Sequence, residues 1–462
     1  MFKFLNVYFP IRLFLLCVSE LALIALVFLL ATLVRFGGDV RLALTYEGGV
    51  VRIAVVTGIF MLCMYYFDLY DTLVVSNRRE VPARLLQVLG TGTVILAVIY
   101  YLYPEVRLAR GIFLPGLLLV TLLLPPWRRL YFWLVRSLRS ANHTVIVGAS
   151  SLAAALSHEL RTRPVSGIDL VGYLDTSSNR AAMNGLPYLG GPEMVSELVR
   201  REGVSRVIVA MEDRRGKLPV EQLLGLKTKG TLVHDGAEIY EIITGKIALD
   251  TLRPSWLVFS PAFRRSRLQK VCKRAISVIG SILALILTAP VMAVIAIAIK
   301  LDSAGPVIFR QQRVGEDGKI FTIYKFRTML DSADAGGQAT PASEDDARFT
   351  FLGRWLRRTR LDELPQLCNI LKGEMDFVGP RPFLPNMEQE LARTIPFYSQ
   401  RWSVKPGATG WAQVNRGYCA TVKENAEKLS YDLFYIKNVS LGLDLLILVQ
   451  TVKILLWGRG AR

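Results

Sequence analysis

Residues 275–299 read AISVIGSILALILTAPVMAVIAIAI, an apolar run of 25 residues that ends at Lys300. At about 1.5 Å per residue, a helix of this length would cross the roughly 30 Å hydrocarbon core of a membrane. Pro290 interrupts the run and divides it into arms of 15 and 9 residues. Proline lacks a backbone donor and clashes with the preceding helical turn. Neither arm alone is long enough to cross.

Basic residues flank both ends of this run. They are Arg264, Arg265, Arg267, Lys270, Lys273 and Arg274 before it, and Arg310 and Arg313 after it. Because Lys and Arg gather on the cytoplasmic side of membranes, we expect both ends to lie there. We therefore predict a re-entrant helix over 275–299 that enters the membrane, bends at Pro290 and returns. A kinked spanning helix is equally open on these arguments, since membrane helices tolerate proline.

Four further apolar segments lie within residues 1–139, at 13–34, 50–67, 85–103 and 111–127. We predict a block of four transmembrane helices, in keeping with a hydrophobic content of 52%, which is high for a soluble protein. The flanking Lys and Arg residues favour both ends of this block in the cytoplasm. This predicts a multi-pass membrane protein. Glu20 has no obvious partner within its segment, and we favour a contact with a neighbouring helix over a transport role.

The charge balance narrows the kinds of partner. With 56 Lys and Arg against 38 Asp and Glu, the net charge is +18, which suits nucleic acid, anionic lipid or a phosphate-rich substrate. The basic residues accompany apolar segments, so we expect membrane lipid and a phosphate-bearing substrate and no nucleic acid. The five cysteines have no metal-ligand spacing. All three histidines precede residue 235, so the C-terminal part must do any chemistry without imidazole.

Residues 143–250 have the pattern of a small parallel sheet. Strand-like segments at 144–147, 170–174 and 206–211 alternate with helical stretches such as 152–160. Gly148 stands where a Rossmann phosphate loop would begin, but residues 149–153 lack the second and third glycines. We predict an α/β, Rossmann-like domain without an intact glycine fingerprint. A scaffold or regulatory role is favoured over dinucleotide binding.

Residues 305–385 are rich in residue types that bind phosphate: RQQRVG at 310–315, YKFRTM at 324–329 and GPRP at 379–382. The alternation over 323–327 predicts an extended strand with Lys325 and Arg327 on one face. Such a fork suits a diphosphate. For any single arginine, a solvated charged surface is the alternative.

Residues 360–373, RLDELPQLCNILKG, predict a short helix. Pro365 fits the first turn, apolar residues recur at helical spacing, and Gly373 is a natural end. Asp362 and Glu363 therefore lie at the helix N-terminus, where unpaired N–H groups favour carboxylates and a phosphate brought up to them. An Asp at this position is commonly only a cap.

Four stretches together resemble signatures of the bacterial sugar transferases, the monotopic polyprenyl-phosphate phosphoglycosyl transferases. They are KFRTM at 325–329, LDELPQ at 361–366, GPRP at 379–382 and KPGATGWAQV at 405–414. The resemblance covers residues 264–462 and implies an α/β catalytic domain with a re-entrant membrane helix. The upstream helices and Rossmann-like domain resemble the layout of the large subfamily.

The resemblance implies a specific reaction. Asp362 would attack a UDP-sugar, release UMP and carry the sugar phosphate covalently until undecaprenyl phosphate takes it. Glu363 would assist, and Asp362 would hold Mg²⁺ with phosphate oxygens. Lys325, Arg327 and Arg381 would contact substrate phosphates. Pro290 matches the helix-breaking proline of the family and so favours the re-entrant helix.

The same resemblance suggests a hexose 1-phosphate, such as that of glucose or galactose, and the first step of exopolysaccharide or O-antigen repeat-unit synthesis. Arg416-Gly417, followed by Tyr418 and Cys419, replaces the Gly-Arg order of many relatives, so the sugar is not assigned. Asp432 could lie near the site or be structural. Residues 441–457 predict a helix lying on the membrane or protein surface.

Two other functions stay open. A membrane-anchored nucleotide-sugar-modifying enzyme would place catalysis in the middle domain and would need an intact glycine fingerprint. A non-catalytic scaffold of a polysaccharide assembly complex would use the basic surface to bind anionic lipid. A catalytic role for the Asp362–Glu363 pair discriminates between these and the transferase. The ligand of the middle domain and the oligomeric state, including a homo-oligomer, are left open.

Overall fold

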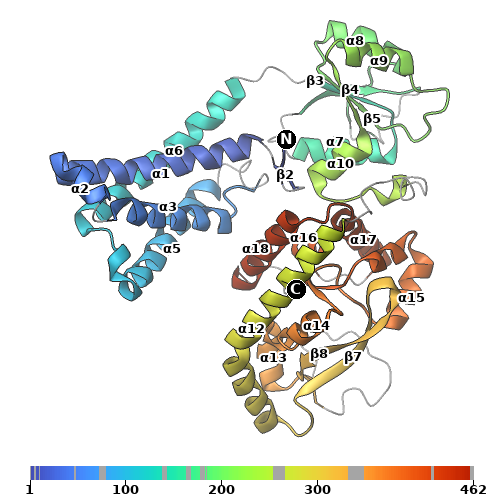
Figure 1. Cartoon of the computed structure of the whole chain (residues 1–462). Coiled ribbons are helices and arrows are strands. Elements are labelled where there is room, and N and C mark those ends of the chain that lie inside the picture. The colour runs from blue at the N-terminus through green and yellow to red at the C-terminus, as the bar shows by residue number, and fades with distance from the viewer. Residues whose placement is uncertain are drawn as a thin grey trace. The chain divides into compact units, whose positions relative to one another are not determined.

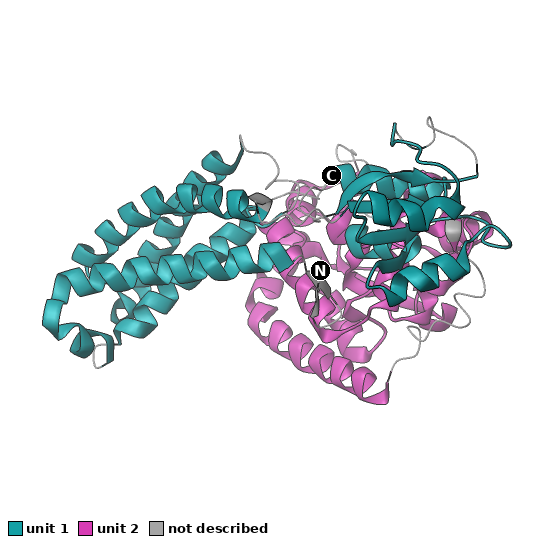
Figure 2. Cartoon of the chain, turned by 90° about the horizontal axis from the view of Figure 1, so that it is seen from above, with its two compact units in different colours: residues 1–3, 8–244 teal, residues 4–7, 245–462 magenta. Residues whose placement is uncertain are grey.

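The computed structural model describes residues 2–4, 7–9, 11–45, 48–71, 80–137, 143–162, 168–176, 183, 185–252, 266–330, 348–417 and 421–457. The chain forms two compact units, residues 1–3 with 8–244 and residues 4–7 with 245–462; they are coloured separately in Figure 2. A short ribbon of β1 (Phe2–Phe4) and β2 (Val7–Phe9) opens the chain.

Long apolar helices follow, as predicted (Figure 1). They are α1 (Ile11–Phe36), α3 (Gly49–Tyr66), α5 (Glu80–Leu102) and α6 (Arg110–Ser137), with the short α2 (Val40–Thr45) after α1. The segments Ile11–Thr45, Gly49–Tyr66, Glu80–Leu102 and Arg110–Val135 are long and apolar enough to span a membrane. Their shared core includes Phe28, Phe60 and Leu96.

Glu20 of α1 has a partner that the sequence pattern did not reveal. Its side chain is fully buried, and Arg128 of α6 donates from Nη2 to Glu20 Oε2 at 2.9 Å and from Nε to Oε1. The Tyr70 hydroxyl donates to the same Oε2 at 2.8 Å. Glu20 therefore contacts a neighbouring helix, as predicted.

The middle region is a four-stranded parallel sheet in the order β4-β3-β5-β6. Its strands are β3 (His143–Val147), β4 (Asp169–Leu174), β5 (Arg206–Val209) and β6 (Leu232–Asp235), and its helices are α7 (Ser151–Thr162), α8 (Val195–Arg201), α9 (Val220–Thr228) and α10 (Gly236–Thr244). The parallel α/β prediction is confirmed. Strand β6 was not predicted: it is an edge strand with no fully buried residue, and its segment LVHD has too little apolar character.

Gly148 serves the packing of this sheet. Its φ is +109°, and a Cβ on it would lie 2.7 Å from the backbone of Met211. The Ser150 hydroxyl also donates to the carbonyl of Ala210, so the turn after β3 is closed onto the end of β5. Gly148 is therefore required because another part of the backbone approaches it closely. This packing explains the glycine without a bound phosphate.

The second unit holds the remaining described α-helices and strands and, among its 3₁₀ elements, η9 and η10. They are α12 (Arg267–Asp302), β7 (Ile308–Val314), β8 (Ile320–Phe326), α13 (Phe351–Arg358), the 3₁₀ turn η9 (Leu361–Glu363), α14 (Gln366–Lys372), β9 (Asp376–Val378), α15 (Pro385–Thr394), the 3₁₀ helix η10 (Tyr398–Ser403), β10 (Gly407–Thr409), α16 (Trp411–Asn415), α17 (Val422–Lys437) and α18 (Leu441–Trp457). Strands β7 and β8 form an antiparallel hairpin, and β9 pairs with β10 in parallel.

Helix α12 continues through Pro290 and changes direction along its length (Figure 1). One side packs against the rest of the second unit at two places. Arg274 donates to the carbonyls of Ile370 and Leu371, and Ile295 and Ile299 enter a buried cluster with Phe326. The other side exposes a row of apolar residues, Ile276, Ile279, Ile282, Leu283, Ile286, Leu287, Val291, Val294, Ile297 and Leu301.

The second unit begins earlier in the chain than residue 264. Ile247 is 3% exposed, joins the core formed with α17, and donates its N–H to Ser430. The indole N–H of Trp411 donates to the carbonyl of Gly245 at 2.8 Å. The segment that leaves α10 is thus part of the same core as the GATG-Trp motif.

Candidate active site

The Asp362–Glu363 pair is placed by a tight turn between two helices. Helix α13 ends at Arg358, and Arg360 then takes a left-handed conformation with φ +60°, which is uncommon for a non-glycine residue. The 3₁₀ turn Leu361–Glu363 follows, and α14 runs from Gln366 to Lys372 with Pro365 as its N-cap and Gly373 at φ +90° as its C-cap. The predicted short helix is confirmed, with both carboxylates just ahead of it.

Asp362 is buried and incompletely satisfied. It is 6% exposed, and among the described residues its Oδ1 has no hydrogen-bond partner. Burial and the charge of Glu363 raise the pKa of Asp362, while Lys325, Arg360 and Arg357 oppose the rise. A buried acceptor without a donor lowers the stability of the folded protein. Groups with such unfavourable environments cluster at functional sites.

Glu363 is held by cations. Its Oε1 accepts from Arg381 at 2.8 Å and from Lys325 at 3.0 Å, with Arg360 at 3.7 Å. Burial alone would raise the pKa of Glu363, but Arg381 and Lys325 together lower it. Burial lowers the pKa of Lys325, against the opposite effect of Glu363. Glu363 therefore stays ionised and fixes both cations beside Asp362.

Four of the predicted site residues thus come together from three separate stretches: Lys325 from β8, Asp362 and Glu363 from η9, and Arg381 from the loop after β9. Arg327 does not join them. Its guanidinium donates to the carbonyls of Ser303 and Ala304 at 2.7 and 2.9 Å. In the described chain it contacts the end of α12, and its phosphate-binding role stays a prediction.

Two further arginines near the pair were not among the predicted site residues, although one of them, Arg313, lies in the RQQRVG stretch. Arg313 of β7 is partly buried; burial, and then the charge of Arg381, lower the pKa of Arg313 to about 10. Arg357 of α13 lies 4.4 Å over the ring of Phe349, and burial lowers its pKa against the effect of Asp362. The RQQRVG pattern at 310–315 was a usable signal for Arg313, whereas Arg357 looks like any exposed helical arginine.

The cations outnumber the carboxylates. Lys325, Arg357, Arg360 and Arg381 act on Asp362 and Glu363, so this cluster has four cations against two carboxylates, an excess of two positive charges. A site of this composition favours a polyanion such as a diphosphate.

The same residues fit a magnesium ion only together with a phosphate ligand. Within the described ranges, no group of three or more His, Cys, Asp or Glu side chains could hold a metal by itself. Asp362 Oδ1 is nevertheless an unengaged carboxylate oxygen. Mg²⁺ commonly uses one or two carboxylates and completes its shell with substrate phosphates and water, so the donor set suits an ion that arrives with the substrate.

The residues left open by the sequence have distinct places. Asp432 is 1% exposed and accepts from Arg401 Nε at 2.8 Å, so it belongs to a buried network and not to the Asp362–Glu363 pair. Arg416 pairs with Glu427 at 3.0 Å, and Tyr418 and Cys419 lie outside the described residues. Helix α18 buries Leu443 and Ile447 and exposes Leu445, Val452, Leu455 and Leu456.

Comparisons with known proteins find matches over two regions of the chain. A family model described as bacterial sugar transferase matches residues 268–458, and one described as a CoA-binding domain matches residues 65–220. The UDP-N-acetylgalactosamine-undecaprenyl-phosphate N-acetylgalactosaminephosphotransferase of Aeromonas hydrophila is 41% identical over 49% of this chain and 52% of its own length. The UDP-glucose:undecaprenyl-phosphate glucose-1-phosphate transferase of Xanthomonas campestris pv. campestris is 34% identical over 67% and 66%.

A shorter relative matches over almost its whole length. The exopolysaccharide production protein PSS of Rhizobium leguminosarum bv. phaseoli is 41% identical over 39% of this chain and 94% of its own length. The chain spans only about half to two thirds of the two longer relatives.

Proposed function

The chain belongs to the bacterial sugar transferase family, and on that basis we propose that it transfers a sugar 1-phosphate from a UDP-sugar to undecaprenyl phosphate. The observation that carries this proposal is the buried Asp362, with an oxygen that accepts no hydrogen bond among the described residues, in a site with excess positive charge. The names of relatives that act on UDP-sugars and undecaprenyl phosphate support the choice of substrates.

The proposed reaction has two displacements at one phosphorus atom. The Asp362 carboxylate attacks the phosphorus that carries the sugar, the P–O bond to the nucleotide breaks, and UMP leaves with that electron pair. A phosphate oxygen of undecaprenyl phosphate then attacks the same phosphorus and displaces Asp362. A carboxylate nucleophile is already ionised and needs no base, in keeping with a second unit that contains no histidine.

The cations supply electrostatic stabilisation in this scheme. Lys325 and Arg381 are fixed on Glu363 before substrate arrives, so little reorganisation is needed when charge develops on the phosphate oxygens. Glu363 assists by holding them and by keeping Asp362 a stronger base. Arg327 is retained as a proposed phosphate contact, although its present partners give it a second role at the end of α12.

Asp362 would hold Mg²⁺ together with phosphate oxygens of the donor. When bound, the ion would neutralise part of the negative charge of the diphosphate. Chelation by EDTA should then stop UMP release, and added Mg²⁺ should restore it. Full activity in EDTA would contradict the proposed Mg²⁺ requirement but would not affect the assignment of Asp362 as the nucleophile.

The proposed location is the bacterial inner membrane, with four N-terminal spans and the second unit on the cytoplasmic face. The contacts of α12 support a re-entrant helix: both its ends pack on one folded unit, whereas a spanning helix puts its ends on opposite sides of the bilayer. The exposed apolar row of α12 would face lipid. A homo-oligomer stays a prediction.

The decisive experiment traps the intermediate. Purified full-length protein is incubated with UDP-sugar alone, and the peptide containing Asp362 is examined by mass spectrometry. We expect the added mass of a sugar phosphate on wild type and none on Asp362→Asn. Asp317→Asn, at an exposed acid on the β7–β8 turn, is the matched control and should label like wild type.

Release of UMP from Asp362→Asn at the wild-type rate would contradict the assignment of the nucleophile. A wild-type chain that releases no UMP from any UDP-sugar would instead favour the non-catalytic scaffold. We propose a hexose donor such as UDP-glucose or UDP-galactose. Measuring UMP release with a panel of UDP-sugars that also contains the N-acetylated sugars identifies the donor. The product would begin an exopolysaccharide or O-antigen repeat unit, a role supported by the relative named for exopolysaccharide production.

A further inference from the structure

The loop of residues 379–383, sequence GPRPF, is hydrogen-bonded along almost its whole main chain. Pro380 and Pro382 have no N–H to satisfy. The carbonyls of residues 380–383 and the N–H groups of residues 379 and 383 all have partners, namely Thr409, Gly407, Arg401, Arg313, Glu388 and Val314. The loop is therefore a rigid support from which the Arg381 side chain reaches Glu363 at 2.8 Å.

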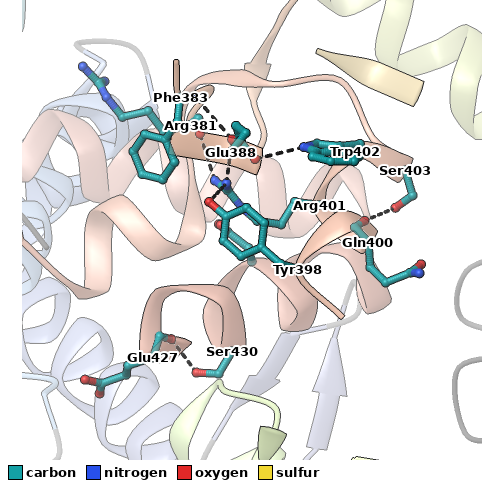
Figure 3. A network of polar contacts seen from close by, with 11 residues as sticks. Arg381, Phe383, Glu388, Tyr398, Gln400, Arg401, Trp402, Ser403, Glu427 and Ser430 are labelled. Atoms are coloured by element: carbon teal, nitrogen blue, oxygen red, sulfur yellow. Dashed lines mark hydrogen bonds and ion pairs between the residues drawn. The ribbon is translucent and has the colours of Figure 1, made fainter. Parts of the chain in front are cut away.

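Arg401 of η10 makes the charged part of this support. Its guanidinium is buried and uses all its nitrogens: Nη2 donates to the carbonyl of Arg381 at 2.8 Å, Nη1 to Glu388 at 3.0 Å and to the Tyr398 hydroxyl at 2.7 Å, and Nε to Asp432 at 2.8 Å. Figure 3 shows the guanidinium of Arg401 between Tyr398, Glu388 and the loop strand of Arg381.

Glu388 of α15 holds the other side of Pro382. Its Oε1 accepts from the Phe383 N–H at 3.3 Å and from Arg401, and its Oε2 accepts from the indole N–H of Trp402 at 3.0 Å. The carbonyl before Pro382 and the N–H after it are thus fixed by one ion pair. A shift of Arg401 or Glu388 would move the segment that carries Arg381.

We propose that Arg401, supported by Glu388 and Asp432, is a positioning residue that sets the Arg381 guanidinium against Glu363 and the phosphates of the donor. Among the described residues Arg401 contacts neither Asp362 nor Glu363, so it acts through Arg381. The inference rests on the proposed transfer reaction and deepens it. An apolar cluster could fill this part of the core equally well, but it could not bind the main chain on both sides of Pro382.

The test is Arg401→Lys in the full-length protein, which keeps the charge but cannot make the four contacts. Misplacing a phosphate contact by a fraction of an ångström raises the donor KM and lowers kcat; we expect kcat/KM to fall about 10- to 100-fold. Partial unfolding would lower only the active fraction and leave KM unchanged. Glu427→Gln is the matched control, because it removes two ion pairs of α17, with Lys246 and Arg416, that do not involve the loop. Its kcat/KM should stay near wild type.

A double-mutant cycle with Arg381→Lys separates positioning from general support. If Arg401 acts through Arg381, Arg401→Lys should change kcat/KM by less than about threefold once Arg381 is already replaced. Effects that multiply independently would overturn the proposal, as would an unchanged donor KM in Arg401→Lys. If that variant does not fold, Glu388→Gln, nearly identical in shape, is measured in the same cycle with the same criteria. If the wild-type protein releases no UMP at all, the proposed function is overturned instead.

Discussion

Two adjacent carboxylates in this protein have opposite electrostatic environments. Burial and a neighbouring negative charge raise the pKa of Asp362, whereas Arg381 and Lys325 overcome burial and lower the pKa of Glu363. A carboxylate that is ionised yet poorly stabilised is a better nucleophile than one held by cations. The placement of Lys325 and Arg381 on Glu363 rather than on Asp362 is what separates the two roles.

This difference predicts opposite shifts of the pH–rate profile. Asp362 must be ionised to attack, so UMP release falls as pH drops through its raised pKa. Glu363→Gln removes a charge that raises this pKa and should move the acid limb to lower pH. Lys325→Met removes a charge that lowers it and should move the limb to higher pH. Both substitutions also reduce the maximal rate, so the measurement is the midpoint of the limb.

Lys372→Met is the control for this prediction. Lys372 lies on α14 and donates to the hydroxyl of Tyr324 at 2.9 Å, away from the carboxylate pair, so its replacement should leave the midpoint in place. Shifts of the same sign in Glu363→Gln and Lys325→Met would contradict the assignment of the acid limb to Asp362.

At the residue level, the sequence predicted those parts of the site that are carried by contiguous motifs. Lys325, Asp362, Glu363 and Arg381 were found because each lies in a recognisable stretch. Lys325 and Arg327 were predicted to lie on one face of a strand. Lys325 bonds Glu363, whereas Arg327 bonds the carbonyls of Ser303 and Ala304, and its phosphate contact stays a prediction. Arg401 was not found, since its importance comes from contacts with α15, α17 and the GPRPF loop that only the folded chain brings together.

Among the elements, α12 shows what a pattern of hydrophobicity predicts about a membrane helix and what it leaves undecided. The apolar run, its ends and the position of Pro290 were readable, but a helix of 36 residues satisfies both a re-entrant and a spanning arrangement. Arg274 near one end and Ile299 near the other both pack on the same unit, which supports the proposed re-entrant arrangement.

Cysteine labelling tests the re-entrant arrangement. In a background without the native cysteines, Ser266→Cys and Asp302→Cys place one exposed thiol at each end of α12. A membrane-impermeant maleimide should leave both thiols unmodified in intact spheroplasts and modify both in inverted vesicles. Modification of position 302 alone from the periplasmic side would establish a spanning helix.

For the whole molecule, the division into units differs from the one that composition suggests. The basic stretch near residue 264 marks the start of the family-like region, but Gly245 and Ile247 already belong to the core of the second unit. The parallel sheet was predicted from the alternation of strand-like and helical stretches, and the long helices from the length of their apolar runs. The β9–β10 pair was missed because each strand has only three residues.

This boundary predicts a difference between two truncated chains. A protein of residues 245–462 should be more stable than one of residues 264–462, because full burial of an isoleucine contributes about 1.5–3 kcal/mol. The measurement is the thermal midpoint of each chain in the same detergent. Ile247→Ala in the longer chain should account for most of the difference, and equal midpoints of the two chains would show that residues 245–252 add nothing to the core.

The buried pair of Glu20 and Arg128 has a consequence for biosynthesis in the proposed membrane arrangement. The two residues are 108 positions apart, so Glu20 leaves the ribosome long before its counter-ion exists. An acidic side chain alone in hydrocarbon costs roughly 2.5–3.5 kcal/mol, which disfavours release of α1 into lipid until α6 has been translated. We therefore expect α1 to be secured in the bundle only after α6 has supplied Arg128.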